Sequence, residues 1–380
     1  MSDLPLLTVH ATPPNSKTKK LLATLWEKKN YVLHYRTLKQ ALAQGVKLKK
    51  IHKILKFRQS NFLQEYIDCN ISRRINATNP YDKLHYKNLS NILFGKFIEC
   101  LRKRSKIYLR TSWDGRAGAE YLISKVNFKR LEIFDENFVA IELNKLIVEY
   151  DRPIYVGFAI LEIAKVLLND FHYNFIWPRY GQNARLIYHD TDSLLYSFSG
   201  GLDPYVMIRE NIERFDTSNF SPDNVFKIPP VNQGLLGLMK SEVASNLISE
   251  VVTLSPKMYA LLLDNLAEIK KAKGIKKYII EKKLTFDQFM QCLFQNKITI
   301  CRQNSIRSKK QKVYTIRENK TALVSRDNKR YQIANSHFTL PYGHKDIEKI
   351  EANNNMNVIN ENNVMYVEQE GEEPMDVNEV

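Results

Sequence analysis

Residues 188–196, which read YHDTDSLLY, decide the fold of this chain. Apolar residues on either side of a short polar run predict two strands joined by a tight turn. The turn carries two carboxylates, Asp190 and Asp192. Carboxylates held at a hairpin tip can share two divalent cations about 3.5–4 Å apart, as in-line phosphoryl displacement requires. Mg²⁺ suits such a site because it prefers oxygen ligands and binds phosphates. The plain alternative is a solvated loop tip.

A second pattern predicts a functional helix about a hundred residues earlier. Lys87, Asn91, Phe94 and Ile98 are spaced to share one helix face, and Gly95 would let a ligand approach closely. A lysine can bind a phosphate, an amide can donate and accept hydrogen bonds, and a ring can stack on a base. The face therefore suits a nucleotide, although an ordinary amphipathic helix is the alternative.

Lysines dominate two further stretches of the chain. Residues 270–283 contain seven lysines around Gly274. Downstream, Thr285 and Gln288 predict a capping box that opens a helix. A second run, for which strands are predicted, could contact phosphates or form a solvated face, and the sequence leaves both open; it comprises Lys47, Lys49, Lys50, Lys53 and Lys56.

Composition points to a polyanionic partner. The 380 residues carry a formal net charge of +16. Residues 351–380 hold eight acids and no Lys or Arg, so the first 350 residues, with 57 basic and 33 acidic side chains, carry +24. A body this basic most often binds DNA or RNA. The acidic end lacks the apolar content for a core and is predicted to be disordered.

Cysteine usage and hydropathy indicate a soluble protein of a reducing compartment. The four cysteines form no Cys-x-x-Cys pair, which argues against a disulfide framework or a zinc site. No apolar run approaches the roughly 18 residues that a membrane span needs. We therefore expect an intracellular protein without a membrane partner.

The order of these patterns resembles that of family B DNA polymerases. Lys-x-x-x-Asn-x-x-Phe-Gly, then Tyr-x-Asp-Thr-Asp-Ser, then Lys257-x-Tyr259 follow one another as the family's fingers, catalytic and primer-contacting motifs do. From residue 20 to residue 344 the chain is similar to the protein-primed branch, nearest to the polymerases of Maverick/Polinton elements and their viral and organellar kin. Supporting stretches are YVLHYR, KIH, PIYVGF, KGIKK and LPYGH.

This resemblance implies an α+β fold, a partial polymerase right hand with a palm sheet, helical fingers and a basic α+β thumb. The expected division is an extended lead-in (1–19), a basic region similar to the terminal-protein region (20–82), fingers (83–106), a palm with the carboxylate hairpin (107–260), a thumb (261–348) and a disordered acidic tail (349–380).

The resemblance also implies a role for each motif residue. Asp190 and Asp192 would be the catalytic carboxylates and ligands of Mg²⁺, with Mn²⁺ as a substitute. Expected nucleotide-binding residues are Lys87, Asn91, Phe94 and Gly95, and expected primer or DNA contacts are Lys257, Tyr259, Lys273, Lys276 and Lys277. Primer–template DNA, a dNTP and a terminal protein primer would be the partners, in the nucleus if the host is eukaryotic.

Two parts of the family pattern do not occur in the sequence: the exonuclease domain and the first polymerase motif, an Asp followed by a Tyr-Pro run. We therefore expect an N-terminally truncated copy whose own activity is doubtful. Three functions stay open: DNA synthesis, an inactive copy that binds DNA without sequence preference, and a metal-dependent nuclease that uses Asp190 and Asp192.

Overall fold

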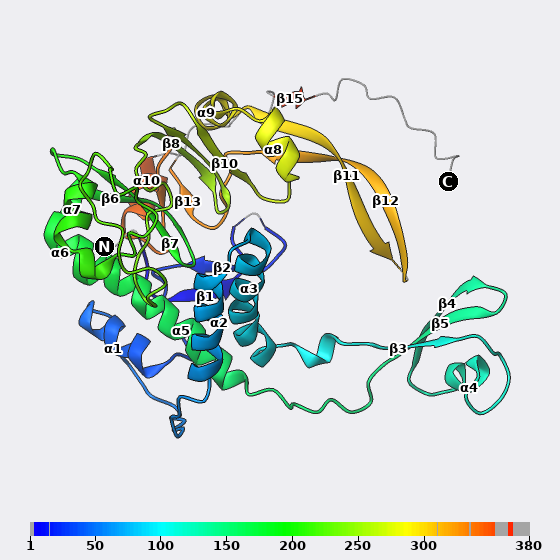
Figure 1. Ribbon diagram of the computed structural model, residues 1–380. Coiled ribbons are helices and arrows are strands. Elements are labelled where there is room, and N and C mark those ends of the chain that lie inside the picture. Colours follow the sequence, from blue (N-terminus) through cyan, green and yellow to red (C-terminus); the bar gives the residue numbers. More distant parts are fainter. Residues whose placement is uncertain (1–3, 15, 310, 334–335, 354–363, 368–380) are drawn as a thin grey trace. The chain divides into compact units, whose positions relative to one another are not determined.

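The computed structural model describes residues 4–14, 16–309, 311–333, 336–353 and 364–367. It confirms a mixed α+β fold of helices and small, mostly antiparallel sheets. Two compact units divide the chain (Figure 1). The first unit comprises residues 1–57, 162–303 and 318–380, and the second comprises residues 58–161 and 304–317.

A helical hairpin begins the second unit. Helices α2 (Gln64–Asn76) and α3 (Pro80–Phe97) lie side by side, and the Tyr66 hydroxyl donates to the Leu89 carbonyl at 3.4 Å (Figure 1). Asn79 caps α3 by accepting the Asp82 N–H, and Pro80 fits the first turn because it has no N–H to leave unpaired. The helix predicted from the spacing of Lys87, Asn91 and Phe94 is confirmed.

A three-stranded sheet completes the second unit, after a short 3₁₀ turn, η1 (Leu101–Lys103). Its order is β3 (Lys106–Arg110), β5 (Phe138–Leu143), β4 (Phe128–Asp135), and α4 (Ala119–Ile123) packs against it. The fully buried Ile141 lies in the core between sheet and helix. This sheet follows directly on the helical hairpin in the chain.

From the sequence, residues 154–156 are expected to form a short strand that precedes a buried helix; the strand is wrong. These residues open helix α5 (Ile154–Asp170), whose near-continuous apolar run can be buried equally well in either conformation. Gly157 allows α5 to pass close to the end of α3, since a Cβ there would collide with Ile98 Cγ2 and lie 3.0 Å from the Phe94 carbonyl oxygen. This contact belongs to the second unit.

In the first unit, α1 (Tyr35–Ala43) packs on the second half of α5. The buried Glu162 accepts the Thr37 hydroxyl at 2.9 Å. From the sequence, residues 38–43 are expected to form a helix that Gly45 stops; this helix is confirmed, and Gly45 has a φ of +88°. The alternation of residues 31–35 also predicts a strand. This strand and the one predicted for residues 47–58 are wrong, since residues 31–34 and 47–58 form no helix or strand and Tyr35 opens α1. Polar and apolar residues alternate there, but in the described part of the chain no strand pairs with them.

The carboxylate hairpin rests on an aromatic core. The π-helical turn η2 (Phe171–Ile176), α6 (Trp177–Tyr180) and the 3₁₀ turn η3 (Gly181–Asn183) lead into β6 (Ala184–Asp190), which pairs with β7 (Ser193–Phe198). Phe175 and Ile176 are almost fully buried in this core, below the hairpin. His172, which has no second metal ligand at a suitable spacing in the sequence, is expected to be structural, and its Nδ1 lies 2.9 Å from the Tyr196 hydroxyl of β7.

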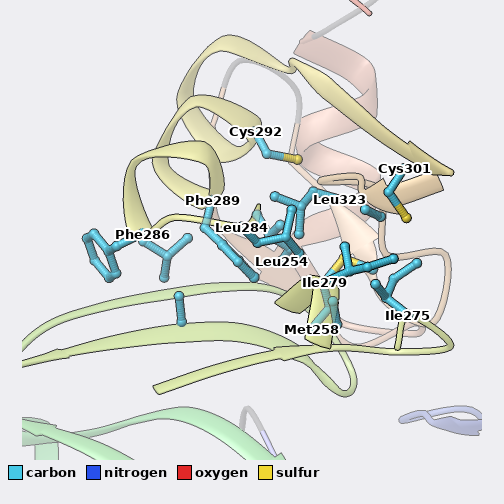
Figure 2. Close-up of a cluster of buried hydrophobic side chains, with 14 residues drawn as sticks. Leu254, Met258, Ile275, Ile279, Leu284, Phe286, Phe289, Cys292, Cys301 and Leu323 are labelled. Atoms are coloured by element: carbon cyan, nitrogen blue, oxygen red, sulfur yellow. The ribbon is translucent and has the colours of Figure 1, made fainter. Parts of the chain in front are cut away.

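The largest core lies between a sheet and two helices. The sheet has the order β10 (Glu268–Ala272), β9 (Met258–Leu263), β8 (Ile248–Ser255), and α8 (Lys277–Lys283) and α9 (Phe286–Gln295) pack against it. Figure 2 shows Leu254, Leu284, Phe289 and Leu323 converging in this core. The predicted capping box of Thr285 and Gln288 is confirmed at the start of α9.

Two long strands extend from this core. They are β11 (Ile298–Lys309) and β12 (Lys312–Leu323), and the strand β15 (Val364–Val367) pairs in parallel with the first residues of β11 (Figure 1). Of the predicted disordered tail, residues 349–353 belong to α10 (Asp346–Asn353) and residues 364–367 to β15, while 354–363 and 368–380 lie outside the described residues.

Short elements complete the first unit. They are the hairpin β1 (Thr8–Ala11) with β2 (Lys20–Ala23), α7 (Pro204–Glu210), the 3₁₀ turn η4 (Ile212–Arg214), and β13 (Tyr331–Gln332) with β14 (Thr339–Leu340). Among the described helices, none is long and apolar enough to cross a bilayer. Cys69 and Cys100 are exposed free thiols, and Cys292 and Cys301 are buried ones.

Asp216 organises the long connection between η4 and β8. Its carboxylate accepts the Ser218 N–H (3.0 Å), the Ser218 hydroxyl (2.6 Å), the Gly234 N–H (3.3 Å) and the Lys240 ammonium (3.1 Å). Burial raises the pKa of Asp216, but these four donors outweigh it and hold the pKa below its usual value. The ionised carboxylate therefore stabilises the folded connection.

We expect Asp216→Ala to lower the free energy of unfolding by about 2–4 kcal/mol at neutral pH, since the substitution leaves several donors without their acceptor. Because folding lowers the pKa of Asp216, its contribution is complete above the unfolded value and is lost as the pH falls through the folded value. Urea unfolding at pH 7 and pH 3 should show the difference shrinking in acid. Asp223→Ala, at an exposed position of the same connection, should change little; equal losses for both variants would contradict this role of Asp216.

Candidate functional site

The tip of the β6–β7 hairpin has an unusual backbone. Asp190 pairs with Ser193, so Thr191 and Asp192 alone form the loop. The Asp192 N–H donates to the Asp190 carbonyl at 2.6 Å, and Thr191 has a φ of +57°. A three-residue turn with a positive central φ is uncommon, and it is costly for a β-branched residue. Strain of this kind is concentrated at functional sites.

Asp190 is half-buried and forms an ion pair. Lys257 Nζ lies 2.5 Å from its Oδ2, and the Thr191 hydroxyl lies 3.2 Å from its Oδ1. Burial raises the pKa of Asp190, but the hydrogen bond and charge of Lys257 outweigh burial, so the pKa lies below its usual value. Asp190 is therefore an anion at neutral pH, in a position that already attracts a cation.

Lys257 reaches Asp190 from the tight turn between β8 and β9. Ser255 pairs with Met258, and Lys257 has a φ of +66° at the position where a type II turn needs a positive φ. Its backbone N–H donates to the Tyr188 hydroxyl at 2.8 Å, which fastens this turn to β6. Asp190 and Lys257, which are 67 positions apart in the sequence, thus form an ion pair.

Tyr259 lies beside the same hairpin. Met258 is buried in the core of Figure 2, and the next residue of a strand points to the opposite face. The ring of Tyr259 packs against Tyr188, with centroids 5.0 Å apart. Burial raises the pKa of both phenols, and the charges of Asp190 and Glu242 raise that of Tyr259 further. Both hydroxyls are therefore neutral at physiological pH.

Three residues that the sequence pattern selected, Asp190, Lys257 and Tyr259, thus come together in the first unit. Sequence reasoning gave no role to Tyr188 and did not consider Glu242. The position of Tyr188 contained a signal, because residues two apart on a strand share a face, and Tyr188 precedes Asp190 by two. Nothing in the spacing of Glu242 pointed to this site.

The two carboxylates fit a hard divalent cation. The Asp192 side chain is exposed and makes no hydrogen bond or ion pair with the described residues. Asp190 and Asp192, two residues apart in one turn, carry anionic oxygens, the ligand type that Mg²⁺ and Mn²⁺ prefer. Within the described ranges, no group of three or more His, Cys, Asp or Glu side chains could hold a metal ion.

Helix α3 carries the other predicted residues, in the second unit. Lys87 and Asn91 are exposed, and Phe94 is half-buried one turn further on. An ideal Cβ on Gly95 would meet nothing within 4 Å, so internal packing does not require a glycine there. The helix therefore carries an ammonium, an amide and a half-buried ring on one face, with open space beside Gly95.

A lysine-rich loop and the start of α8 hold Lys273, Lys276 and Lys277, all exposed. The buried Gln303 of β11 orders this loop, because its amide donates to the Gly274 carbonyl (3.2 Å) and its oxygen accepts the Lys276 N–H (3.1 Å). Gly274 has a φ of +80°, and an ideal Cβ on it would lie 2.9 Å from Lys320 Nζ.

Four basic side chains, Lys273, Lys276, Lys277 and Lys320, are here called the Gly274 cluster. Lys320 lies on β12 and reaches the loop at Gly274. Sequence reasoning missed Gln303 and Lys320, because only the strand pairing brings them to the loop.

A comparison with models of protein families gives one match. Comparisons with curated proteins and with solved structures gave none. The match includes helix α3 and ends before the β6–β7 hairpin. Residues 2–176 are similar to the family described as DNA polymerase type B, organellar and viral.

Proposed function

We propose that this chain carries the nucleotidyl-transfer site of a family B DNA polymerase of the protein-primed type. One observation carries the proposal: the turn at Lys257 and Tyr259 is fastened to the carboxylate hairpin by the Lys257–Asp190 ion pair and the Tyr188 hydrogen bond. A residue that holds a primer phosphate must lie beside the carboxylates at which the primer reacts. The family match of residues 2–176 supports DNA synthesis in general terms.

Each residue then has a defined task. Asp190 and Asp192 would hold a divalent cation, which supplies charge neutralisation and activation of the attacking oxygen when bound. Lys257 would exchange its partner, from the Asp190 carboxylate to a primer phosphate. Tyr259, neutral and packed on Tyr188, would support the terminal nucleotide through its ring.

The incoming nucleotide and the DNA duplex would bind elements other than the β6–β7 hairpin. Lys87 on α3 would bind the triphosphate, and Asn91 and Phe94 would line the nascent base pair beside the open space at Gly95. The Gly274 cluster would bind the DNA backbone, since such lysines neutralise phosphates without reading bases. In this proposal α2 belongs to the region similar to the terminal-protein region, α3 to the fingers, β6 to β9 to the palm, and β10 to β12 to the thumb.

A second function is a copy that binds primer–template DNA without catalysis. The Lys257–Asp190 ion pair favours it in one respect, because Asp190 can stay neutralised without a metal. A terminal protein as primer, an element of the Maverick/Polinton kind as source, and a nuclear or other reducing compartment belong to the same proposal and follow from the resemblance alone.

Replacing Lys87 tests the nucleotide site. We expect Lys87→Ala to weaken dNTP binding about tenfold or more, because a charge-assisted phosphate contact contributes about 1.5–3 kcal/mol. Its affinity for duplex DNA should be unchanged. Dissociation constants for a fluorescent dNTP and for a labelled duplex would be measured by anisotropy.

Lys96→Ala is the matched control for this experiment. Lys96 is exposed on the same helix, nine residues on, which places it about half a turn away from Lys87. It should leave dNTP affinity unchanged. Equal losses for both variants, or loss of duplex binding alone, would show that the Lys87 face is not a nucleotide site.

A further inference from the structure

Residues 46–57, here called the basic–apolar segment, have no task in the proposed site. They belong to the first unit, follow α1 and form neither helix nor strand (Figure 1). Their sequence, VKLKKIHKILKF, contains five lysines and no acid. Lys49 pairs with Glu27 at 2.6 Å. The other four ammonium groups are exposed and have no counter-ion among the described residues; they belong to Lys47, Lys50, Lys53 and Lys56.

The apolar side chains of the basic–apolar segment are exposed as well. Ile54 exposes 77% of its surface and Leu55 67%, and the other four range from 38% at Val46 to 55% at Ile51. A flexible solvated connection is usually rich in Gly and Ser, whereas clustered exposed apolar groups indicate an interaction surface. The segment therefore has two kinds of side chain without a partner, cationic and apolar.

The backbone of the segment decides how these side chains are arranged. A helix would sort Leu48, Ile51 and Leu55 onto one face and the lysines onto another, but no helix forms here. Lysines and apolar side chains instead follow one another along the chain. The backbone N–H groups of residues 47–56 also form no backbone hydrogen bond with any described residue, so they stay available as donors.

A single DNA strand has the matching order of groups. Each of its nucleotides presents a phosphate and a base whose face is open to contact. In a duplex the base faces are stacked inside, so only the lysines of the segment would find a partner there. The cationic and apolar halves of the segment together thus fit a single strand better than a duplex.

We propose that residues 46–57 bind single-stranded DNA, with the lysines on phosphates and the apolar side chains against bases. This inference rests on the proposed function, because a polymerase copies a template that is single-stranded ahead of the primer end. The rings of His52 and Phe57 add stacking surfaces, since both residues are exposed. Twelve residues can extend up to about 40 Å, which allows contact with several nucleotides.

Amine labelling of the full chain tests the contact directly. A labelled oligothymidylate of about 20 nucleotides should slow acetylation of Lys47, Lys50, Lys53 and Lys56 by an N-hydroxysuccinimide ester several-fold. Four lysines exposed elsewhere in the first unit are the internal control and should react as before: Lys17, Lys19, Lys345 and Lys349. Equal protection of both sets, or no protection of the segment, would overturn the proposal.

The salt dependence of binding gives a second readout. Replacing Lys47, Lys50, Lys53 and Lys56 by Gln should reduce the slope of log Kd against log salt by nearly three for the oligothymidylate, because each phosphate contact on a single strand contributes about 0.7. The same replacement at the four control lysines removes the same charge and should leave the slope unchanged. Equal reductions for both variants would mean that net charge alone explains binding, and the proposal would fail.

An apolar variant separates a single strand from a duplex. Replacing Ile51, Ile54 and Leu55 by Ser leaves the charge unchanged and should weaken oligothymidylate binding about tenfold, while duplex affinity stays the same. The matched control places Ser at three apolar residues of the long connection, with exposures of 89%, 58% and 73%: Val225, Leu235 and Leu236. Unchanged single-strand binding in the lysine and apolar variants would contradict the proposal and favour an acid-rimmed groove of a partner protein.

The labelling experiment also distinguishes this inference from the proposed function. Duplex DNA should protect Lys273, Lys276 and Lys277 of the Gly274 cluster from acetylation. If the duplex protects them while the oligothymidylate leaves the basic–apolar segment fully reactive, this inference alone fails. If neither DNA protects any lysine, the proposed function and this inference fail together.

Discussion

Raising NaCl from about 50 to 200 mM is expected to weaken duplex DNA binding by about a thousandfold. The first 350 residues carry a net charge of +24, and the loop lysines Lys273, Lys276 and Lys277 are exposed. A protein that neutralises about six phosphates releases their counterions, and its log Kd then changes linearly with log salt. Fluorescence anisotropy at four salt concentrations, on two unrelated duplex sequences, gives the slope and shows whether sequence matters.

The loop lysines should account for part of that slope. Replacing all three by Gln should reduce its magnitude by nearly three, because each phosphate contact contributes about 0.9. Lys17, Lys19 and Lys349 are exposed elsewhere, and their replacement by Gln removes the same charge. If this control lowers the slope equally, binding is a property of net charge and not of the Gly274 cluster. An affinity for duplex DNA that does not change with salt concentration would contradict the proposed polymerase function altogether.

Local patterns in the sequence were sufficient where one element carries the whole signal. The alternation around Asp190 and Asp192 predicted the β6–β7 hairpin, and the spacing from Lys87 to Phe94 predicted α3. Thr285 and Gln288 predicted the start of α9 because a capping box satisfies its own backbone donors. In each case neighbouring residues determine the structure without long-range help.

The site itself depends on contacts that no local pattern contains. The positive φ of Thr191 and Lys257 is imposed by strand pairing, since neither residue favours it. The ion pair between Asp190 and Lys257, and the hydrogen bond of Gln303 to the loop at Gly274, require the assembled sheets. The strand prediction for residues 47–58 is wrong for the opposite reason. The pattern of a strand is present, but a strand forms only where a partner strand pairs with it.

Asp190→Asn is expected to abolish nucleotidyl transfer, with a loss of at least about a thousandfold. The substitution removes an anionic ligand from the cation position and leaves Lys257 beside a neutral amide. Residues that act as a unit lose most of the rate when one is removed. Asp190 and Asp192 both lie on the β6–β7 hairpin, and a two-metal site needs anionic ligands from a second element as well. The loss should therefore be measured in a protein that carries such a second element.

Primer extension by a fusion tests the central claim most directly. The fusion joins a related polymerase's exonuclease and first-motif segment to this chain, and extension of a labelled primer is followed with Mg²⁺ and with Mn²⁺. The proposed function predicts extension by the fusion, loss in its Asp190→Asn form, and retention in Asp223→Asn, whose exposed acid lies outside the hairpin. An inactive fusion that still binds primer–template would favour the binding module, and a fusion whose extension survives Asp190→Asn would contradict the assignment of this hairpin as the catalytic site.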